Sequence, residues 1–145
     1  MRTILTAVMT GAALLLGGCG EEQWLDHRGE QLRRADMQGR WVVVNYWAEW
    51  CAPCLHELPE FNRLAERPDV LVLGVNYDGV SGAALLELSE RMNIAFSVMG
   101  EDFEQSLQLE RPQVLPTTYI FNPQGELQRS LPGPQTEQGL LALLE

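Results

Sequence analysis

Two of the chain's three cysteines, Cys51 and Cys54, have only two residues between them. A pair at this spacing can bind zinc, attach haem, form a structural disulfide or exchange electrons with other thiols. A structural zinc site needs four ligands, and besides Cys19 the chain offers only His27 and His56. His56 lies two residues beyond Cys54 and His27 lies far upstream. This spacing argues against zinc.

The residues next to the pair argue against haem and against peroxiredoxin chemistry. Covalent haem attachment requires a histidine directly after the second cysteine, where the sequence has Leu55. A peroxiredoxin is expected to have threonine three residues before its cysteine, where the sequence has Ala48. A structural disulfide stays open, although so short a loop constrains the unfolded chain little and therefore stabilises little.

The segments on either side place the pair at the start of a helix. Residues 41–47, Trp-Val-Val-Val-Asn-Tyr-Trp, form an apolar run typical of a strand buried on both faces of a parallel sheet. A helix is predicted over 51–67, with a kink at Pro59. Pro53 fits its first turn, where a missing N–H costs no hydrogen bond. The apolar residues that recur at helical spacing are Leu55, Leu58, Phe61 and Leu64.

A helix that begins at Cys51 makes this cysteine reactive. Its sulfur would lie beside unpaired backbone N–H groups at the positive end of the helix dipole, which stabilise a thiolate. Cys54, one turn later, is expected to be more buried. The position therefore favours electron exchange, with Cys51 as the attacking thiolate and Cys54 as the resolving thiol.

The rest of the chain predicts strands that alternate with helices. Further strands are expected at 24–26, 31–33, 70–75, 95–99, 115–121 and 126–131, the first two joined by a turn at 27–30. Further helices are expected at 83–92 and 102–109, with a short helical piece ending at Gly39. A last helix follows the candidate N-cap Thr136, with Leu140, Leu141, Leu143 and Leu144 packing inward. This order predicts an α/β fold with a central mixed β-sheet flanked by helices.

The amino-terminal segment resembles a bacterial lipoprotein signal. Arg2 precedes an apolar run over 3–16, which is shorter than the roughly 20 residues that span a bilayer. Small residues then precede Cys19, as in a lipobox, where the signal is cut and the cysteine carries the lipid. We expect a signal peptide at 1–18, a lipidated tether at 19–23 and a folded domain at 24–145. An ordinary cleaved signal with a coincidental cysteine would have the same appearance.

Size and charge narrow the functional classes. A chain of 145 residues with 46% hydrophobic content is long enough for one folded domain. Its formal net charge of −10 argues against nucleic acid as a partner, because a phosphate backbone would meet a surface of its own sign. A secretory signal places the domain outside the cytoplasm, where disulfide chemistry is permitted.

Residues 47–54, Trp-Ala-Glu-Trp-Cys-Ala-Pro-Cys, resemble the thioredoxin active-site segment, and the likeness extends over nearly all of residues 22–145. The TlpA-like branch of extracytoplasmic thiol-disulfide oxidoreductases is more similar still. Asn45 stands where cytoplasmic thioredoxins place a buried aspartate, and residues 54–59 match the branch pattern Cys-x-x-Glu-x-Pro. The resemblance implies a thioredoxin-like fold, and the turn at 27–30 predicts an N-terminal hairpin in addition.

A helical insertion of the TlpA type is also implied by the resemblance. Its expected limits are the segments Val75-Asn76-Tyr77-Asp78 and Leu115-Pro116-Thr117-Thr118.

The resemblance also implies roles for single residues. Pro116 would be a cis proline facing the Cys51–Cys54 disulfide, and the backbone of Leu115 would pair with an extended substrate strand. Glu57 would exchange protons with the cysteines, unless it is simply a solvated helix residue. Asn45 cannot act as an acid or a base. The residues implied in substrate binding are Trp50, Ala52, Pro53, Leu115 and Pro116.

Three other side chains near the pair have less specific interpretations. Trp50 is expected at the rim of the docking surface, Glu49 as a surface charge and His56 as a solvated helix residue.

The implied activity is reduction of disulfides in secreted proteins, with apocytochrome c among the expected substrates. The redox-active disulfide needs no cofactor or metal, and a membrane thiol electron donor of the DsbD/CcdA kind would return it to the reduced state. The Ala-Pro dipeptide lacks the histidine found in strong oxidants, which favours a reductant. Gly20 after Cys19 favours the outer membrane over the inner one as the periplasmic anchor site.

Two functions besides that of a reductase stay open. One is an oxidase or isomerase of the same fold, because redox poise depends on thiolate stabilisation that a sequence does not quantify. The other is a non-catalytic binding or chaperone lipoprotein that keeps the thioredoxin surface.

Overall fold

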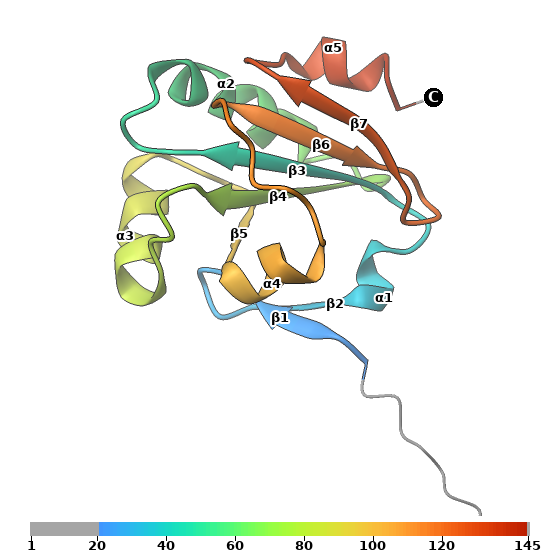
Figure 1. Ribbon diagram of the computed structural model, residues 1–145, viewed down its shortest axis with the longest axis horizontal. Helices are drawn as coiled ribbons and strands as arrows, with labels where there is room; N and C mark the ends of the chain where they lie inside the picture. Colours follow the sequence, from blue (N-terminus) through green and yellow to red (C-terminus); the bar gives the residue numbers. More distant parts are fainter. Residues whose placement is uncertain (1–20, 145) are drawn as a thin grey trace, which may run out of the picture.

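The computed structural model describes residues 21–144; the predicted signal peptide, Cys19 and Gly20 lie outside them. A five-stranded mixed sheet in the order β5-β4-β3-β6-β7 forms the centre of the fold (Figure 1). β3, β4 and β5 run parallel, and β6 and β7 are antiparallel to their neighbours. The strands are β3 Trp41–Trp47, β4 Val70–Asn76, β5 Ser97–Met99, β6 Thr117–Phe121 and β7 Leu127–Pro132.

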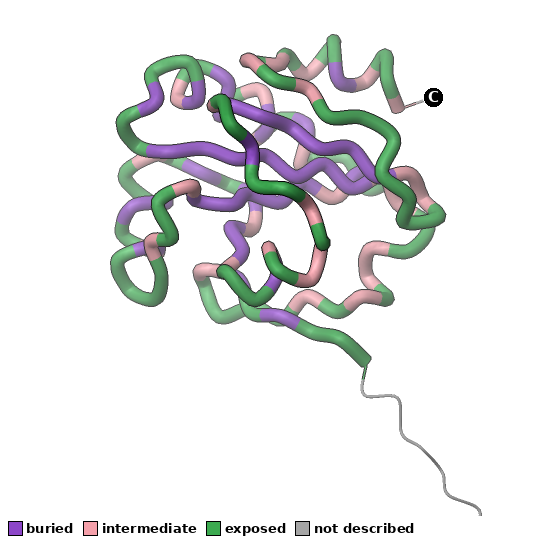
Figure 2. Tube along the Cα trace, in the orientation of Figure 1, coloured by how far each residue is buried: buried purple, intermediate pink, exposed green. Residues whose placement is uncertain are grey.

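Alternation along the central strand β3 directs its side chains into two separate cores. Val43 and Trp47 pack in one core, together with Phe61, Leu85 and Leu140. The helices that contribute to this core are α2 Ala52–Leu64, α3 Gly82–Arg91 and α5 Glu137–Leu141. Figure 2 shows the buried residues concentrated in the central strands, whereas β7 at the edge is mostly exposed.

The second core lies on the opposite face of the sheet. Val44 and Tyr46 of β3 pack there with Trp24 and Phe103, whose rings meet edge to face at 5.2 Å. The elements on this face are β1 Gln23–Leu25, β2 Gln31–Arg33, α1 Arg34–Met37 and α4 Glu101–Ser106. β1 and β2 form the predicted N-terminal hairpin, which therefore covers one face of the sheet.

The segment between β4 and β6 contains α3, β5 and α4, as the predicted insertion requires. Together these elements confirm the predicted α/β thioredoxin-like fold with a central mixed sheet flanked by helices. Among residues 21–144, no helix combines the length and the apolar character needed to cross a bilayer.

Several predicted boundaries differ from the structure. The strand expected at 115–121 begins at Thr117, and the helix expected at 102–109 runs over Glu101–Ser106. Helix α2 is shorter than 51–67 but continues through Pro59. The expectation that Leu143 packs inward is wrong: it is 38% exposed, because α5 ends at Leu141. Leu140 is fully buried, and Thr136 caps α5 by accepting a hydrogen bond from the Gly139 N–H.

Candidate active site

The two cysteines lie where the chain passes from β3 into α2. Cys51 is the N-cap of α2, and its sulfur accepts a hydrogen bond from the Cys54 N–H at 3.3 Å. A disulfide joins the two residues, with their Cα atoms 5.3 Å apart. Cys51 is 5% exposed and Cys54 is fully buried. The cysteine predicted to attack is thus at the helix tip and is the more accessible residue of the two.

Exposed residues surround this helix tip. Trp50 is 66% exposed, and Ala52 and Pro53 are exposed as well. The Trp50 indole N–H donates a hydrogen bond to the Asp78 carboxylate at 2.9 Å. Trp47, by contrast, is fully buried and belongs to the core. Trp50 is therefore exposed beside Cys51, and its role at a docking surface stays a prediction.

The predicted cis proline is present. The peptide bond between Leu115 and Pro116 is cis, and the Pro116 carbonyl accepts a hydrogen bond from the Gly133 N–H at 2.8 Å. Leu115 packs against the core cluster that contains both cysteines. Within residues 21–144, the backbone N–H and C=O of Leu115 make no hydrogen bond. These free groups can accept an added strand.

Glu57 is buried, which overturns the interpretation as a solvated glutamate. It is only 2% exposed and lies one turn after Cys54 on the inner face of α2. Its Oε1 accepts a hydrogen bond from Asn45 Nδ2 at 2.6 Å, and its Oε2 accepts one from the Gln135 N–H at 2.8 Å. Both carboxylate oxygens therefore have a donor in the protein interior.

Burial sets the acidity of this carboxyl. It raises the pKa of Glu57 to about 7, because the charged form loses its hydration, while the hydrogen bonds from Gln135 and Asn45 partly oppose the rise. A group with this pKa exists in both protonation states near neutral pH, as an efficient proton donor and acceptor does.

Two other predictions about nearby side chains hold. Glu49 is on the surface, where it pairs with Arg91 at 3.0 Å, and His56 is exposed. Among residues 21–144, no three His, Cys, Asp or Glu side chains lie close enough together to hold a metal ion.

Sequence reasoning missed the residues that support the site from other elements. Asp78 holds the Trp50 indole, Gln135 donates to Glu57, and the Arg111 guanidinium lies over the Tyr77 ring at 4.1 Å. The Tyr77 ring in turn meets the Trp50 ring edge to face. Asp78 was part of the segment that limits the insertion, but no local pattern marked Gln135 or Arg111.

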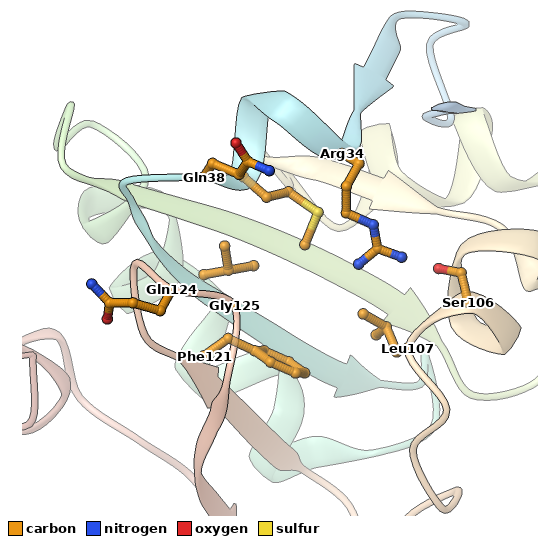
Figure 3. A pocket seen from close by; sticks show the side chains of 9 residues that line it. Arg34, Gln38, Ser106, Leu107, Phe121, Gln124 and Gly125 are labelled. Atoms are coloured by element: carbon orange, nitrogen blue, oxygen red, sulfur yellow. The ribbon is translucent and has the colours of Figure 1, made fainter. Parts of the chain in front are cut away.

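A separate pocket of about 240 Å³ lies at the other end of β3, far from the disulfide. Val42 is among its lining residues, and Figure 3 shows Phe121 on one side of it, with Arg34 of α1 and Ser106 of α4 pointing toward it from the other. None of the residues predicted to act in catalysis or substrate binding lines this pocket. The redox site is therefore a surface at the helix tip rather than this pocket.

Comparisons with known proteins agree with this geometry. The model of the AhpC/TSA family matches residues 20–130. Thiol-disulfide oxidoreductase ResA of Geobacillus kaustophilus is 29% identical over 123 residues, which cover 83% of this chain and 70% of ResA. Thiol:disulfide interchange protein DsbE of Pseudomonas aeruginosa is 34% identical over 104 residues, which cover 71% of this chain and 57% of DsbE.

A solved structure shows the same fold. The exposed lipoprotein thioredoxin of Streptococcus pneumoniae superimposes with a TM-score of 0.71 at 22% identity, covering 85% of this chain and 96% of that one. The superposition confirms the fold, and the family match and the two named relatives confirm the predicted resemblance to thioredoxin-like oxidoreductases.

Proposed function

Since the chain belongs to the AhpC/TSA family and is a thiol-disulfide oxidoreductase, we propose that it reduces disulfides of secreted proteins at a membrane surface. The single observation that carries the proposal is the more accessible cysteine at the N-terminus of α2, with its partner buried one turn later. Such a placement stabilises the Cys51 thiolate and keeps Cys54 away from other proteins.

The reaction proceeds in two exchanges. The Cys51 thiolate attacks one sulfur of a substrate disulfide, forms a mixed disulfide and releases the other substrate sulfur as a thiolate, which takes a proton from water. Cys54 then loses its proton and attacks the Cys51 sulfur, so that the second substrate thiolate leaves and the Cys51–Cys54 disulfide forms. Two electrons pass to the substrate. Glu57, on the same face of α2, accepts the Cys54 proton.

Docking uses the surface around the helix tip. An extended substrate segment pairs with the free backbone groups of Leu115 beside Pro116, and its side chains contact Trp50, Ala52 and Pro53. Backbone pairing is independent of substrate sequence, which suits a reductase with several substrates. Apocytochrome c, whose haem-attachment cysteines react only when reduced, is one candidate.

The anchoring and the electron supply complete the proposal. Cys19 carries the lipid, the domain works in the periplasm with the outer membrane as its anchor, and a membrane thiol donor of the DsbD/CcdA kind reduces the Cys51–Cys54 disulfide. The lipobox-like sequence before Cys19 supports the anchor, and the structurally similar Streptococcus pneumoniae protein is itself a lipoprotein.

Trapping tests the proposal. A Cys54→Ser variant of the full chain should accumulate mixed disulfides with its substrates in the cell, because no resolving thiol can release them. Mass spectrometry identifies the trapped proteins, and Cys51→Ser, which lacks the attacking sulfur, is the matched control. If Cys54→Ser traps no more protein than the control, the chain is a binding or chaperone module instead.

Equilibration with glutathione tests the direction of electron flow. A reductant should have a potential closer to that of thioredoxin, about −270 mV, than to that of DsbA, about −120 mV. A value near the DsbA figure would identify an oxidase and overturn the reductase proposal.

A further inference from the structure

The Asn45 side chain is fully buried beneath the active-site helix. It lies on the same face of β3 as Val43 and Trp47, the face that α2 covers. Its Nδ2 donates to Glu57 Oε1 at 2.6 Å and lies 3.4 Å from Thr118 Oγ1 on the neighbouring strand β6. The short distance to Glu57 is that of a charge-assisted hydrogen bond.

We propose that Asn45 is a positioning residue for Glu57. The Asn45 amide holds the Glu57 carboxylate against the Gln135 loop in one fixed orientation. The inference rests on the proposed role of Glu57 in proton exchange and names the group that makes that role possible. Asn45 itself exchanges no proton, and its side chain donates to Glu57 and Thr118 rather than to either sulfur.

The buried amide oxygen of Asn45 indicates that the amide is oriented by Glu57. Among the described residues, Asn45 Oδ1 has no hydrogen-bond partner. Leaving a buried acceptor unpaired costs about 1–3 kcal/mol, so the orientation is maintained by the stronger bond that Nδ2 makes to the carboxylate.

An amide can serve both protonation states of Glu57. To the ionised carboxylate it presents its N–H donor, as in the structure. When Glu57 takes up a proton, its new O–H needs an acceptor, and half a turn of the Asn45 amide brings Oδ1 to that place. An aspartate at position 45 would offer no donor to an ionised Glu57 and would add a second buried charge.

The other carboxylate oxygen connects this pair to the docking segment. Oε2 of Glu57 accepts from the Gln135 N–H, the Gln135 side chain donates to the Gly133 carbonyl at 3.0 Å, and the Gly133 N–H donates to the Pro116 carbonyl at 2.8 Å. A carboxylate held by Asn45 on one side therefore also holds the loop that supports Pro116.

Among residues 21–144, the groups that donate hydrogen bonds to the Glu57 carboxylate are uncharged. They are the Asn45 amide from β3 and the Gln135 N–H before α5, with Thr118 of β6 behind Asn45. On α2 itself Cys54 is bonded within the disulfide. The charged groups on α2 and α5 pair with one another at the surface: Glu60, Arg63 and Glu137. Apart from burial, which is the largest influence, the titration of Glu57 in the oxidised protein therefore reports on its hydrogen bonds from Asn45 and the Gln135 loop.

Carboxyl-carbon NMR of the oxidised full-length protein tests the proposal, because it follows Glu57 directly and needs no turnover. Asn45→Ala removes the donor to the ionised form, so Glu57 should become a weaker acid. We expect its dissociation constant to fall by about tenfold, as loss of a hydrogen bond to a charged group predicts. Thr118→Val, which removes the group behind Asn45 but no bond to Glu57, is the matched control and should leave the midpoint unchanged.

Kinetics separates positioning from packing. The rate of disulfide exchange should increase with pH as Glu57 ionises, and Asn45→Ala should move this increase to higher pH. In a Glu57→Gln background, the same substitution should leave the pH–rate profile unchanged. If Asn45→Ala lowers the melting temperature but leaves the Glu57 midpoint in place, Asn45 only fills space and the inference is wrong. If the wild-type protein has no exchange activity but Asn45→Ala still shifts the midpoint of the Glu57 titration, the proposed function is refuted and this inference stands.

Discussion

Trp50 and Asp78, 28 positions apart in the sequence, are joined by hydrogen bonds from the indole N–H to both carboxylate oxygens, at 2.9 and 3.2 Å. The indole ring also meets the Tyr77 ring edge to face, with the centroids 6.5 Å apart. The most exposed aromatic side chain beside Cys51 is thus held in place from the end of β4. A fixed aromatic surface loses less conformational entropy when a substrate docks.

Asp78→Ala should weaken docking without changing the chemistry of the cysteines. Loss of this exposed hydrogen bond, which the indole N–H shares between the two carboxylate oxygens, corresponds to about 0.5–1.5 kcal/mol, or roughly a two- to tenfold higher KM, with kcat and redox potential close to wild type. Glu49→Ala, which breaks a surface ion pair with Arg91, is the control and should change KM less than about twofold. An unchanged KM in Asp78→Ala would mean that Trp50 needs no support.

The free energy of unfolding should depend on pH because of the ionisation of Glu57. Burial raises its pKa to about 7 in the folded protein, against about 4.3 when unfolded. Between these values the folded state holds a proton that the unfolded state has released, so the free energy of unfolding falls as the pH rises through this window. A Glu57→Gln variant has no such titration.

Urea unfolding of oxidised wild type and Glu57→Gln between pH 4 and 8 measures the difference. The variant should gain up to about 3 kcal/mol relative to wild type as the pH rises from about 4 to 7, and no more above that. Two curves that stay parallel over the whole range would show that Glu57 has an ordinary pKa.

Asp26 should anchor the N-terminal hairpin to the sheet. It is buried, its Oδ1 accepts hydrogen bonds from the Arg28 and Glu30 N–H groups, and its Oδ2 accepts one from the Ser97 hydroxyl of β5. Asp26→Ala leaves these donors unpaired, and we expect a loss of about 2–4 kcal/mol in the free energy of unfolding.

The control for Asp26→Ala is Asp69→Ala, which removes an exposed ion pair with Arg67 and should cost less than about 1 kcal/mol. Equal losses in the two variants would contradict the anchoring role. Hydrogen exchange of the β1 and β2 amides shows whether the hairpin opens selectively in Asp26→Ala.

Gly74 should tolerate no side chain, because β4 is closely covered at this point. A Cβ atom there would lie 2.9 Å from the Phe96 ring, 3.2 Å from Trp47 Nε1 and 3.3 Å from Val98. Gly74→Ala should therefore lower the free energy of unfolding by about 1–3 kcal/mol through overpacking.

Gly100→Ala serves as the control for Gly74→Ala. Its Cβ would approach only the Asp102 carboxylate, at 3.1 Å, and this side chain can move away. Thermal unfolding compares the stability of the two variants. A Gly74→Ala protein as stable as wild type would show that the core around Trp47 can repack around an added methyl group.

Much of the fold could be predicted from the sequence, because the relevant signals are local. The apolar run of β3 and the helical spacing after Cys51 depend only on neighbouring residues, and both elements form where expected. The sequence does not decide whether Glu57 is buried, because a glutamate on a helix is usually solvated. The failure at Leu143 has the same origin, since a run of leucines does not show where a helix ends.

The atoms that do the chemistry are specified by the sequence alone: two cysteines at the start of a helix, with an X-Pro bond downstream whose cis form the resemblance implied. How those atoms are held depends on the tertiary structure. The register of β3 turns Asn45 toward α2, the loop before α5 brings the Gln135 N–H to Glu57, and the end of β4 brings Asp78 to Trp50. These partners are distant in the chain, so a periodic sequence pattern cannot predict their contacts. Only packing of the sheet against α2 and its loops places them together.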